Sequence, residues 1–173
     1  EVLRTLDGSL RHVVGTVTDI THMKQAEAEL QQLAATDPLT GLPNRSSLLQ
    51  TLQRFHERHT RRGPRPYSVV FLDLDGFKPI NDTFGHAAGD AVLREAAGRF
   101  RDALRPGDVL GRLGGDEFAV LLEDTNEPGA TVVAERLLKA IHDTPFQVGT
   151  HKSRLSASIG IAVYQQDGTD AEV

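Results

Sequence analysis

The chain of 173 residues is long enough for one main domain with a buried core and a short appendage. Its apolar share of 39% and charged share of 25% argue against disorder and membrane burial, and a net charge of −5 gives no electrostatic reason to bind a nucleic acid polymer. The absence of cysteine excludes disulfides, zinc–thiolate sites and thiol nucleophiles. No apolar run nears the roughly 20 residues that cross a bilayer and no signal-peptide pattern is present, so we expect a cytoplasmic fragment without membrane contact.

The first 36 residues are predicted to form a strand and a helix. A turn signal at Asp7-Gly8 and the alternating β-branched residues after it predict a terminal hairpin strand within residues 1–20, too short to fold alone. Thr21 is a suitable N-cap for a helix over residues 21–36. Apolar residues recur in this helix at coiled-coil spacing: Met23, Ala26, Leu30 and Leu33. A helix packed on its own domain is the alternative, but we favour dimerisation because no neighbouring segment obviously covers this face.

A break in the helical pattern marks a domain boundary. Pro38, Gly41 and Pro43 interrupt it, and Asn44 can cap a new helix over residues 45–60. We therefore assign residues 37–173 to a second domain. The basic run at residues 58–66 is predicted to be a solvated loop rather than a nucleic-acid site.

The remaining residues alternate between strand and helix patterns. Strands are predicted over residues 67–75 and 154–164, with a hairpin of residues 109–113 and 117–122 around two glycines. Helices are predicted over residues 77–84, 86–104 and 128–143. This order predicts an α/β (α+β) sandwich in which helices flank a central, mostly antiparallel sheet.

Two groups of carboxylates lie at the ends of predicted strands. Asp73 and Asp75 share one face because side chains alternate along a strand, and as a lone pair they would indicate no more than strand-end capping. Asp116 and Glu117 follow Gly114-Gly115 at the hairpin turn, where glycine permits a positive φ angle and close approach of a ligand. If the two strands are neighbours, Asp73 and Asp116 converge. Their oxygens suit Mg²⁺, with a nucleoside triphosphate as the natural third partner.

A polar cluster lies between these carboxylates in the sequence. Lys78 and Asn81 share one short helix, and His86 and Asp90 are spaced i,i+4 on the next. Asp90 can accept from the N1 and N2 hydrogens of guanine and Asn81 can bond the base edge, whereas adenine has no N1 hydrogen to donate. Taken singly, each residue has a structural explanation as a helix start, a turn or a surface charge. Together they favour a guanine nucleotide, bound without the P-loop or dinucleotide motifs, which the sequence lacks.

These motifs resemble those of the GGDEF-domain diguanylate cyclases of bacteria. The similarity runs from "DPLTGLPNR" through "FLDLDGFKPINDTFGHAAGD" and "RLGGDEFAVLL" to "SIGIAVY". The preceding "GTVTDITHMKQAEAEL" resembles the last strand of a PAS sensor domain running into a signalling helix. The resemblance implies a PAS remnant over residues 1–20, a signalling helix over residues 21–36 and a GGDEF domain over residues 37–173. It also implies that the family's C-terminal helix, which carries two phosphate contacts, is missing here.

The resemblance implies a role for each residue of these motifs. Asp73, the backbone carbonyl of Leu74 and Asp116 would hold Mg²⁺, or Mn²⁺ in its place. Asp116 would also act as the catalytic base, with Glu117 in a supporting role. Nucleotide contacts would come from Asn81 and Asp90 to guanine, from His86 to the nucleotide and from Lys78 to the phosphates, with room left by Gly114 and Gly115.

The implied reaction condenses two GTP molecules into cyclic di-GMP and releases pyrophosphate at each step. Each domain would present one GTP, so two domains must face each other in a two-fold homodimer, held through the N-terminal helix and the catalytic face. Arg105 and Asp108 form an RxxD motif, which in the family is an inhibitory site for the product. An arginine at a helix end before a turn is the alternative. We favour the inhibitory site because arginine can fork onto guanine O6 and N7.

Two functions of different classes remain open. The first is an active diguanylate cyclase. The second is a catalytically weak regulatory module that binds GTP or cyclic di-GMP and controls an attached domain, such as a phosphodiesterase. A cyclase acting on ATP is disfavoured by Asn81 and Asp90.

Overall fold

The computed structural model describes residues 2–4, 10–13, 35–62 and 65–164. The chain divides into two units, Glu1–Leu33 and Ala34–Val173. In the first unit, strands β1 (Val2–Arg4) and β2 (Leu10–Val13) pair in an antiparallel hairpin. The predicted continuation of the strand to residue 20 and most of the helix predicted over residues 21–36 lie outside the described residues. Ala35 and Thr36 at the end of that predicted helix are not helical, since Thr36 forms a β-bridge with Pro43.

The second unit is built on a four-stranded sheet. Its strands are β3 (Ser68–Asp75), β4 (Val109–Gly114), β5 (Glu117–Leu122) and β8 (Ser156–Val163). They lie in the order β4-β5-β3-β8, and every neighbouring pair is antiparallel. The predicted antiparallel sheet is therefore confirmed.

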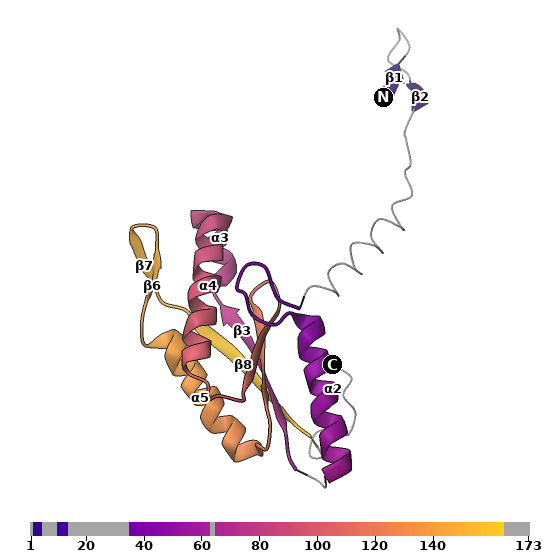
Figure 1. The fold of residues 1–173 in the computed structure, drawn as a ribbon. Helices are drawn as coiled ribbons and strands as arrows, with labels where there is room; N and C mark the ends of the chain where they lie inside the picture. Colours follow the sequence, from indigo (N-terminus) through magenta and orange to yellow (C-terminus); the bar gives the residue numbers. More distant parts are fainter. Residues whose placement is uncertain (1, 5–9, 14–34, 63–64, 165–173) are drawn as a thin grey trace. The chain divides into compact units, whose positions relative to one another are not determined.

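Helices cover both faces of this sheet (Figure 1). One face carries α3 (Phe77–Phe84), α4 (His86–Asp102) and α5 (Glu127–His142), and α2 (Arg45–Arg62) lies on the other. A hydrophobic core lies on each face of the sheet, and β3 contributes to both because its side chains alternate between the faces. Val70, Leu72 and Leu74 belong to the core on the α4 side, whereas Val69 packs with α2. The structure is thus the predicted sandwich of helices around a central sheet.

Local signals explain where the helices begin. The side-chain oxygen of Asn44 accepts a hydrogen bond from the Ser47 amide at 3.0 Å, which confirms the predicted N-cap of α2. Asn126 caps α5 in the same way through the Gly129 amide at 3.2 Å. The helix α3 was predicted with its observed bounds, and α4 ends at Asp102, two residues before the predicted end.

One prediction near a turn was wrong, and one short hairpin was not predicted. The helix α2 continues to Arg62, so the basic run at residues 58–66 is a loop only at its end. Two arginines of this basic run form ion pairs with acidic residues that follow β5: Arg58 binds Glu123 and Arg65 binds Asp124. A hairpin of β6 (Phe146–Val148) and β7 (His151–Ser153) was not predicted, although Phe146 and Val148 alternate before Gly149. None of the described helices could span a membrane, because none is both long and apolar enough.

Candidate functional site

The acidic ends of β3 and of the β4–β5 hairpin lie side by side. The pairing of β3 with β5 sets Asp73 opposite Glu117, and the Leu74 amide donates a hydrogen bond to the Asp116 carbonyl at 3.3 Å. Asp73 and Asp75 are both exposed and alternate with buried leucines, so they project from the same face. Strand pairing therefore brings together the two carboxylate groups that lie more than 40 residues apart in the sequence.

Negative charge accumulates at this edge of the sheet. Burial raises the pKa of Asp73, and the nearby charges of Asp116, Glu117 and Asp75 raise it further. Asp75 accepts a hydrogen bond from the Ser158 hydroxyl at 2.8 Å. Among the described residues, no three His, Asp or Glu side chains are grouped closely enough to hold a metal ion by themselves. The oxygen donors fit Mg²⁺ nonetheless, because this ion commonly keeps waters and shares substrate phosphates.

The hairpin turn needs glycine for its backbone conformation. Gly114 has a φ angle of 149° and Gly115 one of 52°, and both values strain any residue with a β-carbon. A β-carbon added at either position would meet no atom within 4 Å. The predicted positive φ angles are thus present, and the surface above the two glycines is open.

The side chain of Asn81 in α3 lies against α4, close to the residue that joins the two helices. Gly85, with a φ angle of 81°, joins the helices, and its amide donates to the Asn81 carbonyl at 2.9 Å. Asn81 and Asp90 are half-buried, whereas Lys78 and His86 are exposed. The side-chain amide of Asn81 lies against Gly89, the residue before Asp90. The Asn81 side chain of α3 therefore lies against the turn of α4 that carries Asp90.

Arg105 and Asp108 bind each other in this structure. Arg105 donates from Nε to the Asp108 carboxylate at 3.0 Å and from Nη2 to the Glu123 carbonyl and the Thr125 hydroxyl, at 3.1 and 3.0 Å. The Asp108 side chain is fully buried, while that of Arg105 is 58% exposed. A ligand that used both residues would have to compete with their ion pair.

Comparison with known proteins identifies the family. Residues 34–173 match the family model described as "Diguanylate cyclase, GGDEF domain". The chain belongs to this family. The chain is 46% identical over 148 residues to the bifunctional diguanylate cyclase/cyclic di-GMP phosphodiesterase MucR of Pseudomonas aeruginosa, covering 86% of this chain and 21% of that protein. It is 42% identical to the probable diguanylate cyclase DgcE of Escherichia coli, covering 98% of this chain and 15% of that protein.

Relatives with other functions and solved structures are also similar to the GGDEF domain. The cyclic di-GMP phosphodiesterase PdeR of E. coli is 38% identical, over 89% of this chain and 23% of that protein. The chain thus spans about a fifth of the length of these curated relatives. The crystal structure of the diguanylate cyclase SiaD of P. aeruginosa, in complex with its activator SiaC, has a TM-score of 0.73 and 39% identity, covering 86% of this chain and 56% of that one.

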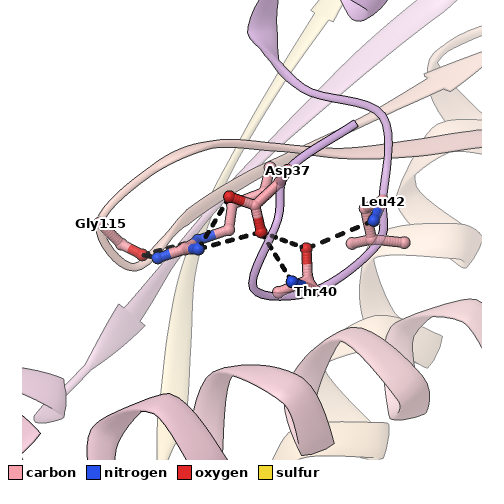
Figure 2. Close-up of polar contacts among 5 residues, drawn as sticks. Asp37, Thr40, Leu42 and Gly115 are labelled. Atoms are coloured by element: carbon pink, nitrogen blue, oxygen red, sulfur yellow. Dashed lines mark hydrogen bonds and ion pairs between the residues drawn. The ribbon is translucent and has the colours of Figure 1, made fainter. Parts of the chain in front are cut away.

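An ion pair that the sequence did not predict connects the start of the GGDEF domain to the turn between β4 and β5, here called the signature turn (Figure 2). Arg112 donates from Nη1 to both carboxylate oxygens of Asp37, each at 3.0 Å, and from Nε and Nη2 to the Gly115 carbonyl at 3.0 and 2.7 Å. Thr40 donates to the same carboxylate from its amide and hydroxyl, at 2.8 and 2.6 Å. The signal in the sequence was an aspartate three residues before a threonine, typical of a turn held by its own side chain.

The partners of Asp37 lower the pKa of its carboxyl group. Burial raises the pKa of the carboxyl, but the hydrogen bonds from Thr40 and the charge and hydrogen bonds of Arg112 outweigh burial and hold the pKa below its ordinary value. The Arg112 amide also donates to the Pro43 carbonyl at 2.9 Å. The segment that enters the domain and the turn that carries Asp116 are therefore held to the same arginine.

Proposed function

We propose that this GGDEF domain is the catalytic half-site of a diguanylate cyclase, which condenses two GTP molecules into cyclic di-GMP and releases two pyrophosphates. The pairing of β3 with β5 carries the proposal, because it sets Asp73 opposite Glu117 and beside Asp116. The family match and the cyclase relatives support it. A role in the cytoplasm is part of the proposal, since GTP is the substrate.

The acidic edge would perform the chemistry. Asp73, the Leu74 carbonyl and Asp116 would hold Mg²⁺ or Mn²⁺, which when bound neutralises phosphate charge and eases loss of the hydroxyl proton. Asp116 takes the proton of the 3′-hydroxyl as that oxygen attacks the α-phosphorus of the second GTP and pyrophosphate leaves. Glu117 supports Asp116 from the adjacent position of the turn.

The surface between α3 and α4 would select the base. Asp90 accepts from N1 and N2 of guanine, and the Asn81 amide bonds the base edge. Adenine would leave the Asp90 carboxylate without a donor, which is costly for a half-buried acceptor. Lys78 binds phosphate, His86 contacts the nucleotide, and the open surface over Gly114 and Gly115 admits it.

Two copies of the domain must meet for the reaction. Each presents one GTP, so a two-fold homodimer aligns the 3′-hydroxyl of one nucleotide with the α-phosphorus of the other. We assign residues 1–20 to the end of a PAS sensor domain, the following segment to a signalling helix that pairs the copies and ends before Ala35, and residues 37–173 to the GGDEF domain. Cyclic di-GMP would then inhibit at Arg105 and Asp108, once it displaces their ion pair.

A regulatory module is the second candidate. In this role the domain binds GTP or cyclic di-GMP and controls an attached phosphodiesterase without efficient turnover. One relative favours it, because PdeR is described as a cyclic di-GMP phosphodiesterase alone. The bifunctional relative MucR supports only the attached phosphodiesterase.

Product formation distinguishes the two functions. The full-length protein is incubated with GTP and Mg²⁺, and cyclic di-GMP is measured beside the variants Asp116→Ala and Asp102→Ala. Asp102 is an exposed carboxylate at the other end of α4 and serves as the control. Product from the wild type and Asp102→Ala, but not from Asp116→Ala, supports the cyclase. Tight nucleotide binding with no product from any of the three supports the regulatory module.

A further inference from the structure

Gly89 occupies a position in α4 where no side chain fits. A β-carbon built on it would lie 2.9 Å from Cγ of Asn81 and 3.1 Å from Cζ of Phe77, and closer still to the Asn81 side-chain oxygen. The first of these distances is one that real β-carbons do not show. The side-chain amide of Asn81 therefore lies directly on the backbone of α4.

The backbone conformation does not explain this glycine. Gly89 lies within the regular helix α4, where alanine would be favoured by about 1 kcal/mol. A second glycine of the same helix, Gly98, offers a direct comparison, because a β-carbon there would meet no atom within 4 Å. Close packing thus requires glycine at position 89 and not at position 98.

The contact determines where the Asn81 amide can lie. Phe77 is buried on the inner side of α3, and the Gly85 amide holds the Asn81 carbonyl at 2.9 Å, so the backbone of this turn has little freedom. The side-chain amide lies over Gly89, the residue before Asp90 in α4. It is thereby held against the turn of α4 that carries the carboxylate proposed to bind the same base.

We propose that Gly89 is a positioning residue for base selection, because its missing side chain lets the Asn81 amide lie beside Asp90 where both meet the edge of guanine. This inference rests on the proposed function, in which Asn81 and Asp90 recognise guanine. A methyl group at position 89 displaces the amide, since the Asn81 oxygen ends a flexible side chain and rotates more easily than two packed helices separate. The substitution Gly89→Ala therefore leaves the fold intact and weakens recognition of the base.

The test combines a matched control with a double-mutant cycle. Binding of a non-hydrolysable GTP analogue and its ATP counterpart is measured by calorimetry on the full chain, for the wild type, Gly89→Ala, Gly98→Ala, Asn81→Ala and the double variant Asn81→Ala/Gly89→Ala. Thermal unfolding is recorded for each. Gly89→Ala weakens binding of the GTP analogue roughly tenfold, which corresponds to the loss of about one hydrogen bond. It also reduces the preference of the protein for the GTP analogue over the ATP analogue. Gly98→Ala binds like the wild type, and Gly89→Ala has no further effect once Asn81 is alanine.

Each contrary outcome identifies what fails. The inference is overturned if Gly89→Ala weakens binding of the GTP analogue equally in the wild type and in Asn81→Ala. Gly89 would then act independently of Asn81. Loss of folding in Gly89→Ala also overturns it, since the glycine would then serve the packing of α3 on α4. If Asn81→Ala weakens binding of the GTP analogue and Gly89→Ala does not, the inference about Gly89 fails while base recognition by Asn81 stands. If Asn81→Ala changes nothing, base recognition by Asn81 fails and the inference fails with it.

Discussion

The substitution Asp37→Asn tests the ion pair between the domain entrance and the signature turn. The side chains of Asp37 and Arg112 are only 17% and 11% exposed, so water screens their attraction weakly. Asparagine keeps one oxygen for Thr40 but loses the charge and one of the two oxygens that face Arg112. Hydrogen bonds to charged groups contribute about 1.5–3 kcal/mol each, and we expect a loss of about 2 kcal/mol in the free energy of unfolding. For a domain of this size the melting temperature should fall by roughly 4–8 °C.

The loss should depend on pH in a defined direction. The pKa of Asp37 is lowered in the folded state, so its ionised form stabilises the fold above the unfolded-state value of 3.8. That stabilisation disappears as the pH falls through the lower folded-state pKa. The difference in unfolding free energy between wild type and Asp37→Asn should therefore be constant from about pH 5 to 7 and shrink below about pH 4.

Urea denaturation followed by circular dichroism measures this difference, because the chain has no tryptophan for fluorescence. Asp124→Asn is the matched control, because it removes the same charge from the ion pair between Asp124 and Arg65. The side chains of this pair are 50% exposed for Asp124 and 68% exposed for Arg65. That pair should contribute no more than about 1 kcal/mol. The explanation is refuted if Asp37→Asn costs no more than the control, or if its cost is unchanged at pH 2.5.

Three other substitutions have defined outcomes. Arg99→Ala should lower the unfolding free energy by about 2–4 kcal/mol in urea titrations, because this arginine binds the carbonyls at the end of α5 and lies 3.8 Å from the Phe146 ring centroid. Arg105→Ala should relieve inhibition by added cyclic di-GMP without raising the initial rate; inhibition that persists would make Arg105 a purely structural residue. Asp73→Asn should abolish product formation yet slightly raise the melting temperature in metal-free buffer, because it removes the Asp73 charge, which the nearby charges of Asp116, Glu117 and Asp75 repel. A lower melting temperature in that variant would contradict the like-charge explanation.

Most of the secondary structure could be predicted because its signals are local. The apolar run of β3, the glycines that bound α3 and the Asn44 cap of α2 each specify one element from a few neighbouring residues. The errors lie where tertiary contacts decide. The end of α2 continues past the predicted stop, with Arg58 of its last turns paired to Glu123, and the hairpin β6–β7 has strands of only three residues.

The order and spacing of the motifs are enough to identify the chemical groups: the two acidic strand ends, the turn glycines and the polar residues of α3 and α4. These groups can be found in the sequence because they depend on neighbours along the chain. Which of them meet depends on the folded structure. The pairing of β3 with β5 sets Asp73 opposite Glu117, Arg112 reaches back 75 residues to Asp37, and Gly89 admits the Asn81 amide. These contacts depend on strand order and helix packing, which the burial of the whole core establishes and no local spacing encodes.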